Sequence, residues 1–203
     1  MRVSALAAIL GLTVAAVAAP AVAEPWTDPA GRLVFEMPRG WNEAEEVRQT
    51  ANFTAVSIFD PNHDCSILAQ PNQGTRSLSP TRVREAVARD DQFDEEFLEN
   101  AITSFPSLLN GAEPEVVSHS LDTSGDWPIF RVEYAAGAKT IHGALQLRPG
   151  LDITSACAIY DGADSASDYD AFFRSIGTPR DAEWEAQAAT AAAEPAEAAP
   201  TEE

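Results

Sequence analysis

The 203-residue chain carries 32 acidic and 13 basic side chains, which gives a formal net charge of −19 at pH 7. This excess of negative charge excludes nucleic acid as an expected partner, because its phosphate backbone would be repelled. It excludes anionic membrane surfaces for the same reason. We expect an unknown protein or a small ligand as the partner. The charge either keeps the protein in solution or attracts a specific basic partner.

The first 23 residues have the pattern of a secretory signal peptide. Arg2 supplies a positive charge, the run from Val3 to Val17 is mostly apolar, and Ala21-Val22-Ala23 forms a small-residue cleavage site. The apolar run is too short and too alanine-rich for a membrane span, which needs about 20 strongly apolar residues. We expect cleavage after Ala23, a periplasmic or secreted protein, and no stable membrane insertion after cleavage; an uncleaved anchor is the alternative.

The chain divides into the signal peptide (1–23), a single folded domain (24–180) and a tail (181–203). The tail holds seven acidic residues, no basic residue, and Trp184 as its one large apolar side chain. This apolar surface is too small to offset the entropy cost of ordering the segment. We therefore expect a disordered acidic tail, rich in Ala, Glu and Pro, that folding does not require.

The domain begins with three expected strands. The first covers 32–37 and follows a turn-prone segment at 28–31. The second covers 52–60, where apolar and small side chains alternate with period two. The third covers 65–70 and forms a hairpin with the second across a short turn.

Two helices are expected next. Ser79 is a good N-cap and Pro80 suits the first helical position, so the first helix runs to about Arg89. Apolar residues repeat at four-residue spacing from Phe93 to Phe105, including Phe97, which predicts a second helix with one buried face. Pro106 ends or kinks it.

The remaining pattern is four strands and a helix. Period-two alternation predicts strands over 116–121, 129–134, 140–148 and 151–160, separated by glycine-containing turns. A last helix covers 167–176 and stops at Gly177. Because strands and helices are segregated, we predict an α+β fold, an antiparallel sheet of six to seven strands with helices packed on it.

Two cysteines remain in the mature chain, Cys65 and Cys157. An even pair in an oxidising compartment favours a disulfide, and two cysteines allow one intramolecular pairing. Neither belongs to a C-x-x-C motif, so a structural bridge is expected rather than a redox-active one. Both lie in predicted strands with apolar neighbours on the same face, which points the thiols inward.

The segment Phe35-Glu-Met-Pro-Arg-Gly-Trp41 resembles the F-x-x-P-x-G-W start of PsbP-like domains. The order of elements is similar as well, so the resemblance spans roughly Trp26 to Thr178. It implies a central antiparallel sheet flanked by helices, in a family of mostly small binding or assembly proteins. No catalytic motif belongs to that fold generally, and no photosystem-specific feature is present, so the resemblance supplies no site residue.

The residues themselves offer no catalytic motif. The run His63-Asp64-Cys65 places three potential ligands together, but adjacent residues of a strand cannot all face one metal. His63 is therefore interpreted as an exposed turn residue, and we expect neither a metal site nor a cofactor. His119 and His142 lie on separate predicted strands, and no G-x-S-x-G elbow or phosphate-binding glycine loop is present.

One predicted surface is a candidate ligand site. Alternation places polar side chains of two neighbouring strands on one sheet face, with bases in an otherwise acidic chain: Arg131, His142, Gln146 and Arg148. The alternative is the ordinary solvated face of an antiparallel sheet.

These observations favour an exported, non-enzymatic binding or assembly module of the bacterial envelope. A small periplasmic hydrolase, with a site assembled from scattered residues such as His119 or His142, is the alternative. A structural envelope protein without a small ligand is a third possibility.

Overall fold

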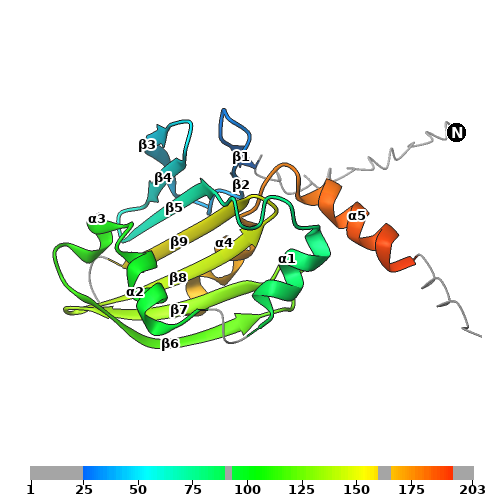
Figure 1. Cartoon of the computed structure of the whole chain (residues 1–203). Coiled ribbons are helices and arrows are strands. Elements are labelled where there is room, and N and C mark those ends of the chain that lie inside the picture. Colours follow the sequence, from blue (N-terminus) through cyan, green and yellow to red (C-terminus); the bar gives the residue numbers. More distant parts are fainter. Residues whose placement is uncertain (1–24, 90–92, 160–165, 194–203) are drawn as a thin grey trace, which may run out of the picture.

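The structure is a computed structural model that describes residues 25–89, 93–159 and 166–193 (Figure 1). The predicted signal peptide and residues 194–203 lie outside these ranges, so both remain predictions. In the described ranges, no helix has the length and apolar character needed to cross a membrane.

A seven-stranded antiparallel sheet forms the centre of the molecule (Figure 1). Its strand order is β3-β4-β5-β9-β8-β7-β6. The strands are β3 (Asn42–Gln49), β4 (Thr54–Phe59), β5 (His63–Pro71), β6 (Pro114–Asp122), β7 (Ile129–Ala136), β8 (Lys139–Arg148) and β9 (Leu151–Ile159). The predicted α+β fold with a sheet of six to seven strands is confirmed.

Helices cover both faces of the sheet. They are α1 (Pro80–Val87), α2 (Glu95–Ile102), α3 (Pro106–Leu109), α4 (Asp170–Ser175), which follows the 3₁₀ turn η1 (Ala166–Tyr169), and α5 (Asp181–Ala193). The helices α2 and α3 bury Leu98 and Leu108 against one face, together with Val132 of β7. The helix α4 buries Phe172 and Phe173 against the other face. Alternation along each strand thus supplies two separate apolar cores.

One edge of the sheet differs from the prediction. The segment 32–37 contributes only β2 (Val34–Phe35), which pairs with β1 (Trp26–Thr27) outside the main sheet. Its side chains still reach the core, because Leu33 and Phe35 are fully buried on the α4 face. The edge strand is instead β3, whose sequence NEAEEVRQ has no apolar alternation and so gave no strand signal.

The second predicted helix also differs in its start and its buried face. Asp94 caps α2 by accepting a hydrogen bond from the backbone N–H of Phe97 (2.8 Å), so the helix begins at Glu95. Phe93 therefore precedes the helix, although it remains buried. The expected burial of Phe97 is wrong: this side chain is 45% exposed.

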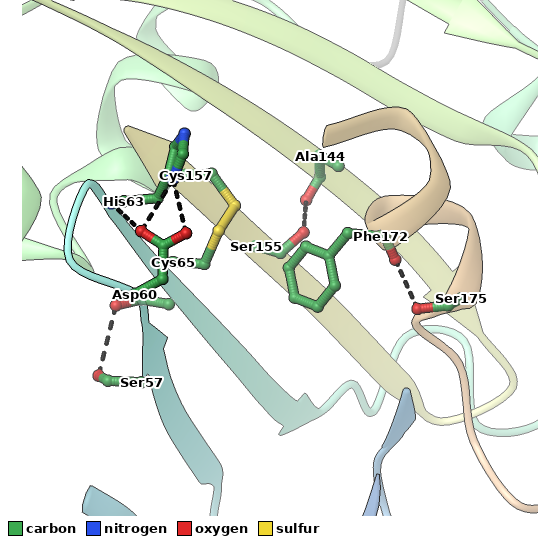
Figure 2. Close-up of a disulfide and its surroundings, with 10 residues drawn as sticks. Ser57, Asp60, His63, Cys65, Ala144, Ser155, Cys157, Phe172 and Ser175 are labelled. Atoms are coloured by element: carbon green, nitrogen blue, oxygen red, sulfur yellow. Dashed lines mark hydrogen bonds and ion pairs between the residues drawn. A yellow bond between two sulfur atoms is a disulfide. The ribbon is translucent and has the colours of Figure 1, made fainter. Parts of the chain in front are cut away.

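The predicted disulfide between Cys65 and Cys157 is confirmed (Figure 2). The two residues lie directly opposite each other on β5 and β9, with their Cα atoms 4.1 Å apart. Both are fully buried in the core that also contains Phe172 of α4. The bridge joins residues 92 positions apart, and in the chain-entropy model a loop of this length contributes about 4–5 kcal/mol to the free energy of unfolding.

The prediction of a disordered segment directly after Arg180 is wrong for the described part of the tail, Asp181–Ala193. These residues form α5, which packs beside α1 (Figure 1). Trp184 is 5% exposed and packs against Val83 and Trp127 in a third, smaller apolar cluster. The domain therefore extends beyond the predicted boundary, and the buried Trp184 anchors this alanine-rich helix.

We expect Trp184→Ala to lower the free energy of unfolding by about 3 kcal/mol, since it removes a buried indole. Urea unfolding followed by circular dichroism measures the change. Gln187→Ala, on an exposed position of the same helix, is the control and is expected to change stability by less than about 0.5 kcal/mol. Equal stability of Trp184→Ala and the unmodified protein would contradict the docking of α5.

Candidate functional site

The polar surface predicted from the sequence is not a solvated sheet face. Its four residues share the face that η1 and α4 cover, and three are almost fully buried: His142, Gln146 and Arg148 are 2–3% exposed. Arg131 is partly buried at the rim of the same face. The sequence therefore identified the residues that share a face but not their burial.

Arg131 holds α4 against the sheet. Its guanidinium lies 2.9 Å from Asp170 of α4 and 3.3 Å from Asp122 of β6. Arg174 of α4 completes this network at 2.7 Å from Asp122. Burial raises the pKa of Asp122, but hydrogen bonds from Ser124 and Arg131 and the nearby charge of Arg174 outweigh it and hold the pKa below its usual range.

The three buried residues also have partners within the chain. Gln146 donates a hydrogen bond to the backbone oxygen of Phe173 (2.9 Å), near the end of α4. The ring of His142 lies 5.5 Å from that of Tyr169, and its Nδ1 is 3.9 Å from a carboxylate oxygen of Glu133. These contacts give the predicted ligand residues a role in packing.

Two separate clefts are lined by the four predicted residues. Arg131 and His142 line a cleft of about 80 Å³. Gln146 and Arg148 line another of about 310 Å³, beside the end of α4. Ligand pockets usually measure roughly 300–1,000 Å³, so the first holds little more than solvent. Ligand binding by these four residues stays a prediction.

The histidines have local structural roles. His63, expected to be an exposed turn residue, is half-buried, and its Nδ1 lies 2.9 Å from an oxygen of Asp60 across the β4–β5 turn. It also stacks against Trp41, with ring centroids 5.5 Å apart. His119 stacks on Phe130. Within the part of the chain that the structure describes, no three potential metal ligands converge.

A further cleft lies elsewhere, between the β5–α1 loop, the β8–β9 turn and α5. It has a volume of about 760 Å³, and we call it the arginine groove. Of the described residues that line it, two are arginines, Arg76 and Arg180, and none is acidic. The full lining is Pro71, Gln73, Arg76, Ser77, Leu78, Ser79, Pro80, Pro149, Gly150, Arg180, Trp184 and Gln187.

The β5–α1 loop is tied to the β8–β9 turn, which fixes one side of the groove. The Thr75 hydroxyl donates to the backbone oxygen of Arg148 (3.0 Å) and accepts from the backbone N–H of Gly150 (3.1 Å). The backbone N–H of Asn72 donates to the Gly150 oxygen (3.0 Å), and its side-chain amide donates to Asp152 (2.8 Å). These bonds orient the loop before any ligand arrives.

Gly150 allows the close approach of Arg76. Its φ of +78° is a conformation that favours glycine, and a Cβ built on it would lie 3.4 Å from the Cα of Arg76. A larger residue at this turn would both strain the backbone and displace Arg76.

The opposite wall of the groove is the start of α5. Arg180 places its guanidinium 4.7 Å from the ring centroid of Trp184, which orients the charge over an apolar surface. Arg180 is also 3.3 Å from Glu183, but both side chains are more than half exposed. Such an exposed ion pair is weak and leaves Arg180 able to exchange partners.

Sequence reasoning missed the arginine groove because its walls come from three distant segments. The Ser79-Pro80 helix start and the Pro149-Gly150 turn were recognised, but each as a local signal. The third segment, Arg180–Gln187, was assigned to the boundary of a disordered tail. No pattern in the sequence indicates that these three segments meet.

Comparisons with known proteins give a fold and no identity. No family model matches the chain, and no curated protein matches it. Among solved structures, the chain is similar to cyanobacterial PsbP from Synechocystis sp. PCC 6803, with 13% identity, a TM-score of 0.47, and coverage of 82% of this chain and 98% of that chain. It is also similar to a crystal structure from Bacteroides thetaiotaomicron VPI-5482, with 10% identity, a TM-score of 0.45, and coverage of 79% of this chain and 50% of that chain. The resemblance to PsbP is thus weak and limited to the fold, and no function is drawn from it.

The half-buried carboxylate of Asp152, which accepts hydrogen bonds from Asn72 of the β5–α1 loop, predicts a pH effect on stability. Burial raises the pKa of Asp152, and the hydrogen bonds from Asn72 offset only part of this increase. A carboxyl whose pKa is raised by folding contributes stability below its unfolded pKa and loses that contribution as pH rises through the folded pKa.

Asp152→Asn removes this titration. We therefore expect the stability of the variant, relative to the unmodified protein, to improve as pH rises from about 3 to about 6. Urea unfolding at a series of pH values measures the difference. A difference that stays constant over this range would contradict the assignment.

Proposed function

We propose that the mature protein is an exported, non-enzymatic binding module that holds an acidic, extended protein segment in the arginine groove. The observation that carries this proposal is the local charge. In a chain with a net charge of −19, this cleft of about 760 Å³ is lined by Arg76 and Arg180 and by no acidic residue. The local field in the groove therefore attracts the carboxylates that the rest of the surface repels.

The other residues of the groove suit a peptide better than a small anion. Guanidinium groups bind carboxylates through paired, charge-assisted hydrogen bonds. The lining also includes the exposed Leu78, which supplies apolar surface, and the edge of the mostly buried Trp184. Proline-rich segments bind in such grooves as extended chains, whose low conformational entropy reduces the cost of binding. An acidic segment with apolar residues between its carboxylates fits this chemistry.

The proposed location is the periplasm or the exterior of a bacterial cell. The buried Cys65–Cys157 disulfide fits an oxidising compartment. The pattern of the first 23 residues supports export by a signal peptide. A role in holding or assembling proteins of the envelope is consistent with both.

The hydrolase alternative has less support. His142 is almost fully buried and lines a cleft of about 80 Å³, which is too small for most substrates. His119 is exposed, stacks on the ring of Phe130 and lines the same small cleft.

We expect the mature protein to bind a fluorescent peptide built of Glu-Pro-Leu repeats, and not the matching Lys-Pro-Leu peptide. Arg76→Glu and Arg180→Glu should each weaken binding about tenfold or more, because each replaces a charge-assisted hydrogen bond with repulsion. Fluorescence anisotropy at two salt concentrations measures the affinity, which should fall as salt rises.

Arg82→Glu is the matched control. It changes the net charge equally on α1, where the Arg82 side chain is 71% exposed and does not line the groove. We expect less than about a threefold effect from it, owing to screening by salt. Equal losses for all three variants would reduce the effect to net charge, and failure to bind the Glu-Pro-Leu peptide would favour a structural envelope protein.

A further inference from the structure

The helix α5 is attached to the domain through its first turn. Among residues 181–190, Trp184 is the one buried side chain, and the others are exposed or half-exposed. Asp181 supplies the second attachment, since its carboxylate faces Arg148 of β8. Docking of the whole helix therefore depends on two side chains three positions apart.

Arg148 is a cation in the interior, only 2% exposed. Its Nε and Nη2 donate to the two carboxylate oxygens of Asp181 at 2.9 and 3.0 Å. Its guanidinium also lies 4.3 Å from the ring centroid of Trp127, against which Trp184 packs. Burial lowers the pKa of Arg148, and the charges of Asp181 and Glu185, both in α5, offset part of this effect. A buried cation whose hydrogen-bonded carboxylate lies on α5 favours the docked position of that helix.

Asp181 does not line the arginine groove, but Arg180, which directly precedes it, and Trp184 and Gln187 of α5 do. We propose that Arg148 and Asp181 are positioning residues for the groove, so that docking of α5 and binding of the acidic segment are thermodynamically coupled. This inference rests on the proposed function and specifies how that site is assembled.

The coupling follows from the geometry. When α5 leaves the domain, the groove loses one of its two arginines and its indole, so the undocked state cannot hold the segment in the same way. A ligand that binds only the docked state shifts the population toward it. The apparent affinity is then the affinity of the docked state multiplied by the docked fraction.

Hydrogen exchange of the α5 amides, read by mass spectrometry in the full mature chain, tests the coupling. Residues 188–190 are suitable because none of them lines the groove. With the Glu-Pro-Leu peptide at about one hundred times its Kd, we expect exchange of this segment to slow by up to about a hundredfold, the limit for a ligand that binds only the docked state. Amides of α2 should not change.

Asp181→Asn should accelerate exchange in α5 about tenfold or more, because the buried guanidinium of Arg148 then loses the ionised carboxylate to which it is hydrogen-bonded. Peptide affinity should fall by the factor by which the docked fraction falls. Asp181→Glu keeps the carboxylate, so it should restore part of the slow α5 exchange and part of the peptide affinity. Glu96→Gln on α2 makes the same change in net charge at an exposed position and should alter neither.

Ala189→Gly provides a second test that leaves Asp181 and the groove intact. Its side chain is exposed, and glycine in a helix interior should accelerate α5 exchange about fivefold.

If the peptide binds but leaves α5 exchange unchanged, the coupling is wrong and the proposed function stands. If the peptide does not bind at all, the proposed function fails, and the inference with it.

Discussion

The burial of Arg148 is the interaction on which the C-terminal half of the structure depends. An isolated guanidinium inside a protein is strongly unfavourable, so its position on β8, an interior strand of the sheet, requires a carboxylate and additional hydrogen bonds. Asp181 supplies the first by starting α5, and Gln146 accepts a further hydrogen bond from Nη2 (3.1 Å). Gln146 in turn bonds to α4. One buried charge therefore fixes the positions of two helices.

The arrangement of the sheet could be predicted because period-two alternation and glycine turns are local signals. The hairpins β7–β8 and β8–β9 meet at Gly137 and Gly150, both with positive φ, as the turn residues indicated. The cysteines lay in strands with the correct inward face, so their pairing followed. The strand β3 gave no such signal, since it is a polar edge strand held by pairing with β4.

The candidate site could be predicted only in part. The burial of Arg148 and the folding of α5 were both missed because each depends on contacts between segments that are distant in the sequence. Alternation correctly placed Arg148 on a sheet face with His142 and Gln146, but it could not indicate that α4 and α5 cover that face. Composition correctly described residues 181–203 as poor in apolar surface. An average over the whole segment, however, does not show that a single side chain within it can be buried. A single indole and a single carboxylate, both directed at β8 and its neighbours, were enough to dock the helix.

The arginine groove shows a similar difference between the net charge of the whole chain and the charge of one local surface. The net charge of −19 suggested a basic partner as one possibility. That inference uses only the summed charge of the whole protein and not its distribution over the surface. At physiological salt, however, a charge acts over about 8 Å. A ligand in the groove meets Arg76 and Arg180 and no acidic lining residue, and the carboxylate of Glu183 lies beside Arg180, 3.3 Å away. The sign of the partner is therefore set by the walls of the groove, and one wall is held in place by the ion pair of Arg148 and Asp181.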